Sequence, residues 1–176
     1  MINSPDNSVH FGSTDSVAGR FSYLWQESDA PVVLASGWTE DRDALLRLVH
    51  PQLRPDPEQI DAAGHPVIDR AVGRYSDGEL SAIDTITARQ RSGPFIESAW
   101  RALRETVAGS GASYTELAAH AGRPEAVRAA AAACACNAVA LFVPCHRIVR
   151  RDGGLGGFRY GLPVKRTLRD HEARWS

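Results

Sequence analysis

The sequence contains few cysteines, and the three it has, Cys134, Cys136 and Cys145, lie within twelve residues of one another. An odd and clustered set of this kind does not predict a disulfide framework, and it indicates a reducing, cytoplasmic setting. One Cys-x-Cys pair without a second pair is also weak support for a structural zinc site. We therefore expect neither disulfides nor a bound metal.

Long hydrophobic runs are lacking as well. No apolar stretch approaches the roughly 20 residues that cross a bilayer. Residues 1–6 have neither a basic region nor an apolar core, so no secretory signal is expected. The chain has 176 residues, of which 43% are hydrophobic, enough to bury a core in one large domain or two small ones.

The chain also lacks a large excess of either charge, but its formal net charge of −1 hides an asymmetry between its two halves. Residues 1–90 carry 7 arginines against 14 acidic residues, a balance of −7, whereas residues 91–176 carry 13 basic and 7 acidic residues, a balance of +6. This division suggests that only the second half meets a polyanion.

The acidic half, residues 1–90, is predicted to be a small α/β scaffold domain. Short strands over residues 9–37 precede two helices, near residues 40–50 and 66–75. His10, His50 and His65 are scattered, and nothing has the spacing of a catalytic or metal site. We expect this half to carry no reacting group.

The basic half, residues 91–176, is predicted to be mostly helical. After a helix from Pro94, Ser113-Tyr114-Thr115-Glu116 has the pattern of a capping box, and Arg123-Pro124 is expected to open the next helix. Two helices joined by a tight glycine turn have the spacing of a helix-turn-helix. The second is rich in alanine, with Arg128 as its one long side chain. It is either a buried packing helix or a slim helix that lies against DNA.

Residues 138–143 are expected to form a buried, strand-like run that leads to Cys145, which lies in the segment 141–149, Leu-Phe-Val-Pro-Cys-His-Arg-Ile-Val. Cys145 stands beside His146 and close to Arg147, Arg150 and Arg151. Positive charge near a thiol lowers its pKa and makes it a better nucleophile. The segment alone fits a packed core cysteine equally well.

Residues 150–161 form a glycine-rich stretch in which arginines and aromatics alternate, as in loops that close over a flipped base. Its glycines do not match a phosphate-binding fingerprint, because no βαβ unit surrounds them. A last helix from Pro163 carries His171 and Glu172.

These residues together resemble the O6-alkylguanine-DNA alkyltransferase (methylated-DNA–protein-cysteine methyltransferase) family. The resemblance rests on Pro144-Cys145-His146-Arg147, preceded by Ser113-Tyr114, Arg128 and Asn137 and followed by the Gly-aromatic-Arg-aromatic-Gly loop and Glu172. It covers residues 94–173 strongly and residues 8–90 loosely. It implies a ribonuclease-H-like α/β domain, a helical domain with a helix-turn-helix, and irreversible single-turnover transfer of an alkyl group from O6-alkylguanine in duplex DNA.

The resemblance also implies roles for individual residues. Cys145 would accept the alkyl group, His146 would take its proton through a water, Glu172 would orient the histidine, Tyr114 would protonate the leaving guanine, and Asn137 would fix the turn before the cysteine. The other implied contacts are with DNA, by Ser113, Tyr114, Arg128, Ala129, Ala131 and Arg151, and with the flipped base, by Val143, Ile148, Phe158 and Arg159. No cofactor, membrane or obligate protein partner is implied. Activity on O4-alkylthymine and cooperative assembly on DNA are left open.

The chain departs from the family pattern at several positions. Ala138 stands where many members have proline, Ala131 and Ala132 where glycine is frequent, and Phe158 where tyrosine is common. None of these changes removes a reacting group. Two other functions remain: a cysteine hydrolase using Cys145 and His146, and a DNA-binding lesion sensor. Adjacent cysteine and histidine rarely aim at each other directly, which disfavours the first, and sensors of this kind lack the acceptor cysteine, which disfavours the second.

Overall fold

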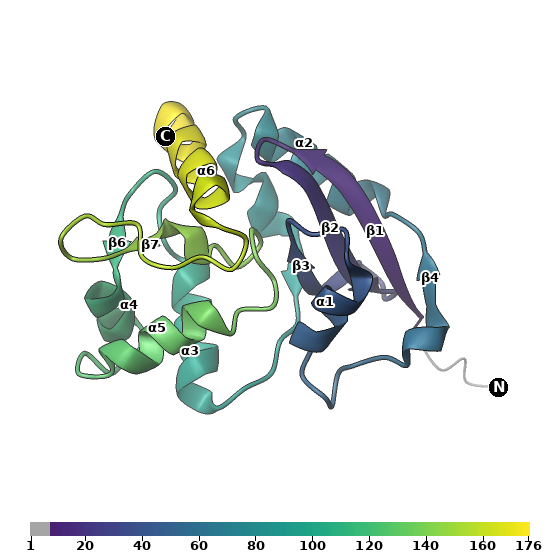
Figure 1. Cartoon of the computed structure of the whole chain (residues 1–176), viewed down its shortest axis with the longest axis horizontal. Coiled ribbons are helices and arrows are strands. Elements are labelled where there is room, and N and C mark those ends of the chain that lie inside the picture. The colour runs from purple at the N-terminus through teal and green to yellow at the C-terminus, as the bar shows by residue number, and fades with distance from the viewer. Residues whose placement is uncertain (1–7) are drawn as a thin grey trace.

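A computed structural model describes residues 8–176 of the chain. The expectation that residues 1–6 are no secretory signal concerns a segment outside the described residues. The protein is a small α/β structure in which a sheet lies on one side and most of the helices on the other (Figure 1). None of the helices in the described part is both long and apolar enough to cross a membrane.

The main sheet has five strands in the order β4-β1-β2-β3-β5. Antiparallel pairing joins β1 to β2 and β2 to β3, whereas β4 runs parallel to β1 and β5 parallel to β3. The predicted strands over residues 9–37 are confirmed. The bounds are β1 Val9–Ser16, β2 Gly19–Gln26, β3 Val32–Gly37, β4 Ile60–Ala62 and β5 Thr87–Ala88.

Two helices and two 3-10 turns pack around this sheet. Helix α1 (Arg42–Leu48) packs against β2 and β3, and α2 (Pro66–Ser76) packs against β1. The 3-10 turns are η1 (Pro57–Gln59) and η2 (Leu80–Thr85). Because β3 is buried along its whole length, both of its faces belong to the core.

The remaining helices build the second half of the chain. A short parallel pair, β6 (Ala112–Ser113) and β7 (Ile148–Val149), joins the segment before α4 to the segment after the cysteine turn. The capping box predicted at Ser113 is present: the Ser113 hydroxyl accepts from Glu116 N, and the Glu116 carboxylate accepts from Ser113 N. The helices are α3 Pro94–Arg104, α4 Tyr114–His120, α5 Val127–Ala135 and α6 Leu162–Trp175, with a 3-10 turn, η3, at Cys145–Arg147.

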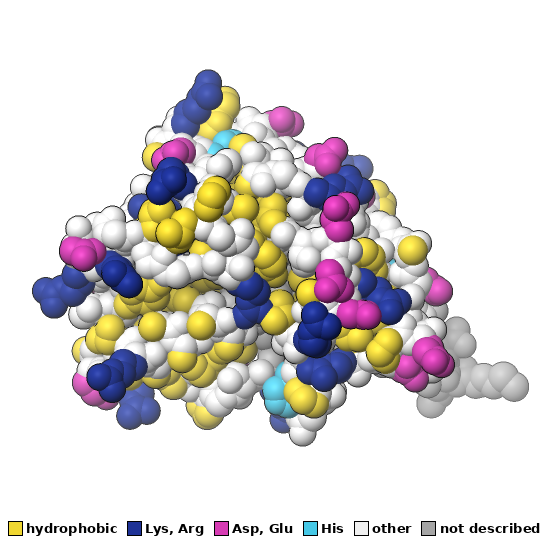
Figure 2. Space-filling view, in the orientation of Figure 1, with side chains coloured by type: hydrophobic (Ala, Val, Ile, Leu, Met, Phe, Trp, Pro, Cys, Tyr) yellow, Lys and Arg dark blue, Asp and Glu magenta, His cyan; other side chains and the backbone are white. Residues whose placement is uncertain are grey.

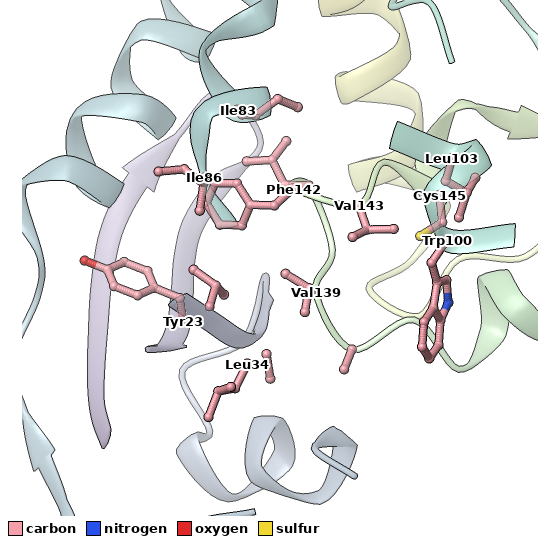
Figure 3. Close-up of a cluster of buried hydrophobic side chains, with 14 of the residues drawn as sticks. Tyr23, Leu34, Ile83, Ile86, Trp100, Leu103, Val139, Phe142, Val143 and Cys145 are labelled. Carbon is pink, nitrogen blue, oxygen red and sulfur yellow. The ribbon is translucent and has the colours of Figure 1, made fainter. Parts of the chain in front are cut away.

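The segment 138–143 joins the two halves. Val139 and Phe142 pack on the sheet side, near Tyr23 and Ile83, and Val143 lies toward α3 (Figure 3). Ser36 N donates to Ala138 O at 2.9 Å, and Ala140 N donates to Ser36 O at 3.3 Å. These two bonds attach the segment to β3, so the hydrophobic core is continuous across both halves.

Two local predictions were wrong. Helix α5 begins at Val127, not at Arg123-Pro124, because Ala126 N donates to Arg123 O and closes a turn first. Residues 138–143 are buried as expected but form turns rather than a strand, and Leu141 has φ 73°. A short apolar run predicts burial more surely than it predicts strand geometry.

Candidate active site

Cys145 is the first residue of η3 and lines a pocket of about 470 Å³. The residue is 8% exposed, so most of its surface is shielded from solvent. Hydrophobic side chains gather in the hollow between α5 and the loop before α6 (Figure 2). The lining residues are Tyr114, Ala131, Cys134, Ala135, Asn137, Ala140, Cys145, Gly157, Phe158, Arg159 and Tyr160.

Small residues of α5 form one wall, and aromatic residues of the loop form the other. Ala131 and Ala135 leave the α5 side open, while Phe158 and Tyr160 close the opposite side. Planar rings facing small side chains suit a flat, partly apolar guest. The pocket therefore has the shape and chemistry to hold a purine or another aromatic ring beside the thiol.

Asn137 holds the backbone that carries the cysteine. Its Nδ2 donates to Val143 O at 2.8 Å, and its Oδ1 accepts from Val139 N at 3.1 Å. Cys145 N donates to the same Val143 O at 2.9 Å. The asparagine is buried and bridges Val139 and Val143, in the turn before the cysteine that it was predicted to fix.

His146 and Glu172 are in direct contact, as predicted. His146 Nε2 lies 2.8 Å from Glu172 Oε1, and both residues are buried. The buried His146 Nδ1 has no hydrogen-bond partner within residues 8–176. If Nε2–H donates to the carboxylate, Nδ1 is left as a lone-pair acceptor, the form needed for a base.

Arg147 completes this group, although the sequence alone predicted no contact of Arg147 with Glu172. It is 3% exposed, and its Nε and Nη2 donate to Glu172 Oε2 and Oε1 at 3.0 and 3.1 Å. Burial alone would raise the pKa of Glu172, but hydrogen bonds and charge from His146 and Arg147 outweigh it and hold that pKa well below its usual range. Burial lowers the pKa of His146. Glu172 is thus ionised and His146 neutral.

The N-terminal half also reaches this group, although it was expected to be only a scaffold. Tyr75 Oη on α2 donates to Glu172 Oε1 at 3.0 Å. Nothing in the sequence pointed to Tyr75, because it is separated from Glu172 by 97 positions. His171 Nε2 in turn lies 2.7 Å from Tyr75 O and fixes α6 against α2.

The electrostatics of the thiol differ from the prediction. Arg147 is committed to Glu172, while Arg150 and Arg151 are exposed, so none of the three accounts for the state of the sulfur. Burial raises the pKa of Cys145, and the Asn137 hydrogen bond, Lys165 and Arg159 oppose that rise. A buried thiol of raised pKa needs a base, and His146 supplies one.

Lys165 is the single lysine of the sequence and is fully buried. Its Nζ donates to Ile148 O at 2.6 Å and to Gly157 O at 3.3 Å, and so fastens the loop to β7. Burial lowers its pKa. Two features of the sequence single it out: it is the one lysine of the chain, and it lies four residues after the glycine-rich loop.

Most other predicted site residues lie around the pocket. Tyr114, Phe158 and Arg159 line it, and Arg159 donates to Ala135 O across its mouth. Burial raises the pKa of Tyr114, so its hydroxyl stays protonated and able to donate. Val143 and Ile148 are not among the residues that line the pocket; Val143 O accepts from Asn137, and Ile148 O accepts from Lys165. Their contact with a flipped base stays a prediction.

The residues predicted to contact DNA lie at the pocket entrance or on the outer surface. Ser113 caps α4, and Ala131 lines the pocket while Ala129 is partly exposed on the same helix. Arg128 and Arg151 are exposed. Within residues 8–176, no group of three or more His, Cys, Asp or Glu side chains could hold a metal ion.

Comparison with known proteins gives concordant results. A family profile described as "6-O-methylguanine DNA methyltransferase, DNA binding domain" matches residues 94–174. The methylated-DNA–protein-cysteine methyltransferase of Salmonella typhimurium is 33% identical over 160 residues, covering 90% of this chain and 94% of that protein. The bifunctional transcriptional activator/DNA repair enzyme Ada of Escherichia coli is 47% identical over 83 residues, 47% of this chain and 23% of that protein.

A solved structure of similar fold comes from Mycobacterium tuberculosis: an OGT in complex with DNA, at 25% identity with a TM-score of 0.75, covering 96% of this chain and 95% of that one. The match to the Salmonella typhimurium relative and the match to the solved structure each extend over nearly the whole chain. The chain therefore belongs to the methylated-DNA–protein-cysteine methyltransferase family.

Proposed function

We propose that this protein repairs duplex DNA by direct reversal, moving the alkyl group of O6-alkylguanine to the Cys145 sulfur in one irreversible turnover. The observation that carries the proposal is the Cys145 thiol in the lining of a ring-sized pocket, next to a neutral histidine oriented by a buried carboxylate. The relatives named as methylated-DNA–protein-cysteine methyltransferases support the same activity.

The reaction begins with removal of the thiol proton. Cys145 gives its proton through a water to His146 Nδ1, the buried nitrogen without a protein partner among the described residues. Glu172 accepts from Nε2 and stabilises the imidazolium that forms, while Arg147 keeps the carboxylate ionised. This is the nucleophile–base–orienter arrangement.

The thiolate then displaces guanine at the alkyl carbon. The S–C bond forms as the C–O6 bond breaks, and the electron pair of that bond goes to O6. Tyr114, at the pocket wall, gives a proton to the departing base, since an anionic guanine is a poor leaving group. The product is a thioether, which water does not cleave, so each molecule reacts once. No step in this scheme calls for a cofactor.

The geometry of α4 and α5 supports a helix-turn-helix that delivers the base. Helix α4 is capped by Ser113 and α5 follows after the turn at Gly122, with the alanine-rich face of α5 leading into the pocket. We assign Arg128 to the space that the flipped base leaves in the duplex. Ala129 and Ala131 allow α5 to approach the DNA closely. Contacts with the DNA backbone are assigned to Ser113, Tyr114 and Arg151. Phe158 and Arg159 then hold the flipped base.

The two halves fit a division into an α/β scaffold domain, residues 1–90, and a DNA-binding, alkyl-accepting domain, residues 91–176. A ribonuclease-H-like fold for the first is supported by its antiparallel β1-β2-β3 with β4 added parallel to β1. A cytoplasmic location agrees with a substrate that is DNA and with a thiol that must stay reduced.

The test is incubation with a duplex that contains O6-methylguanine, followed by mass analysis of the cysteine peptides. We expect one added methyl group on the Cys145 peptide and none on the peptide with Cys134, which lines the same pocket but has no base beside it. The variant Cys145→Ser should acquire no methyl group. An unmodified Cys145, under conditions in which an active relative reacts, would overturn the proposal.

A further inference from the structure

Gln90 lies in the connection between β5 and α3, a polar segment of the sequence. Its side-chain amide makes two hydrogen bonds to adjacent residues after α5. Nε2 donates to Asn137 Oδ1 at 2.9 Å, and Oε1 accepts from Ala138 N at 2.7 Å. One half-buried side chain therefore clamps the start of the segment that ends at Cys145.

The first bond fixes which way the Asn137 amide faces. Because Gln90 Nε2 and Val139 N both donate to Oδ1, the oxygen is held toward them and Nδ2 toward Val143. Nδ2 is then placed to donate to Val143 O and toward the Cys145 thiol. A rotated amide would present its oxygen to the sulfur, which disfavours the thiolate.

The second bond satisfies a donor that a proline could not have. Ala138 is 4% exposed, and its N–H points to Gln90 Oε1. An unpaired buried N–H is costly, so without Gln90 this part of the backbone is expected to shift toward water. With proline at position 138 the donor would be absent and the backbone stiffer. The acceptor on Gln90 is therefore useful only because residue 138 is not proline and keeps its N–H donor.

We propose that Gln90 is a positioning residue for alkyl transfer, holding Asn137 and the backbone at Ala138 so that the Cys145 sulfur is presented to the alkyl carbon. The proposal rests on the transfer function proposed above. Gln90 touches no reacting atom and acts only through Asn137 and the 138–145 backbone.

The first experiment compares Gln90→Ala with wild type and with Gln52→Ala, an exposed glutamine of the N-terminal half, as the matched control. Single-turnover transfer from a methylated duplex is measured over a range of protein concentrations. We expect the maximal rate to fall on the order of tenfold, as for a small displacement of the nucleophile. The concentration for half-maximal rate should stay within about twofold, because binding is not affected.

The second measurement is independent of DNA. Iodoacetamide alkylation of Cys145 is followed against pH, and the profile of Gln90→Ala should move to higher pH because the Asn137 donor is no longer held toward the thiol. Gln90→Glu keeps the acceptor for Ala138 N but loses the donor to Asn137. It should show the same shift if amide orientation is what matters.

The third measurement is a double-mutant cycle. Ala138→Pro alone should slow transfer, because Gln90 Oε1 then faces a ring carbon. Adding Gln90→Ala should then cost less than the roughly tenfold it costs in wild type, because the bond to Ala138 N is already absent and only the bond to Asn137 is lost. Unchanged rate and alkylation profile in Gln90→Ala would overturn the proposal. So would a loss of rate that matches the loss of folded protein in thermal melts.

If the proline variants do not fold, the alkylation profiles of Gln90→Ala and Gln90→Glu decide. If the wild type transfers no methyl group while Gln90→Ala still moves the alkylation profile to higher pH, the transfer function is refuted and the role of Gln90 in positioning Cys145 stands.

Discussion

At the scale of single residues, Glu172 determines the chemistry of the site. One carboxylate accepts hydrogen bonds from Tyr75 and Arg147 and contacts His146. Because Arg147 already neutralises the carboxylate, His146 need not be charged to satisfy it. A buried histidine that stays neutral between turnovers is ready to accept the thiol proton.

Removal of Arg147 should show how much this arrangement depends on it. Arg147→Ala leaves an ionised carboxylate buried without its cation, which costs about 3–5 kcal/mol of unfolding free energy in comparable pairs. Urea denaturation measures the loss. Exposed Arg151→Ala is the control and should change stability by less than about 0.5 kcal/mol. Equal losses of unfolding free energy in the two variants would show that the Arg147–Glu172 pair does not stabilise the fold.

At the scale of elements, the glycine-rich loop before α6, residues 150–161, is held by residues at and just after the end of β3. Trp38, Phe158 and Tyr160 form a cluster of rings with centroids 5.7–6.0 Å apart. Tyr160 Oη donates to Ser36 O at 3.2 Å. The ring of Tyr160 sits where a side chain at Gly37 would lie, 2.0 Å from the position of a Cβ. Glycine at position 37 is therefore required for the loop to dock.

Two glycine substitutions should act in opposite directions. Gly37→Ala forces Tyr160 away and should destabilise the fold by about 1–3 kcal/mol, as overpacking does. It should also slow reaction with free O6-benzylguanine, since Tyr160 lines the pocket. Gly73→Ala, inside α2 with open space around its Cβ, should stabilise by roughly 0.5–1 kcal/mol. Thermal melts check both, and destabilisation by both would contradict the steric argument.

The elements also show what the sequence could predict. Alternation and turn residues predicted the three long strands, the capping box predicted the start of α4, and the Pro-Cys-His-Arg motif with Glu172 predicted the contact of His146 with a carboxylate. These signals are local or belong to a motif. Tyr75, Gln90 and Tyr160 act through packing between distant segments, and no spacing in the chain encodes that. Residues 138–143 were misread because burial alone does not distinguish a strand from a buried turn.

At the scale of the whole molecule, the group around Glu172 joins the two halves of the chain. Tyr75 belongs to α2, His146 and Arg147 to η3, and Glu172 to α6. Protonation of His146 or Glu172 would therefore loosen the contact between the halves and also weaken the catalytic arrangement. Stability and activity should share a dependence on pH.

The direction of that dependence follows from the two pKa shifts. The folded pKa of His146 is lowered, so below the unfolded value of about 6.5 the unfolded chain binds a proton that the folded one does not, and stability starts to fall. The folded pKa of Glu172 is also lowered, so its contribution is full above about 4.3 and is lost as the pH falls further. Urea midpoints should decline from pH 7 to 5.5, and again below 4.5. In His146→Gln the first decline should shrink, and an unchanged decline would contradict the assignment.

The burial of Lys165 has a consequence for the outer surface. Since the sequence has no other lysine, every exposed cationic side chain apart from histidine is an arginine. The outer surface therefore offers phosphate planar guanidinium groups, which can form paired hydrogen bonds, in place of compact ammonium charges. Reagents that acylate ε-amines meet no exposed lysine on the folded protein, so labelling measured on the Lys165 peptide reports on the opening of the contact between β7 and the loop.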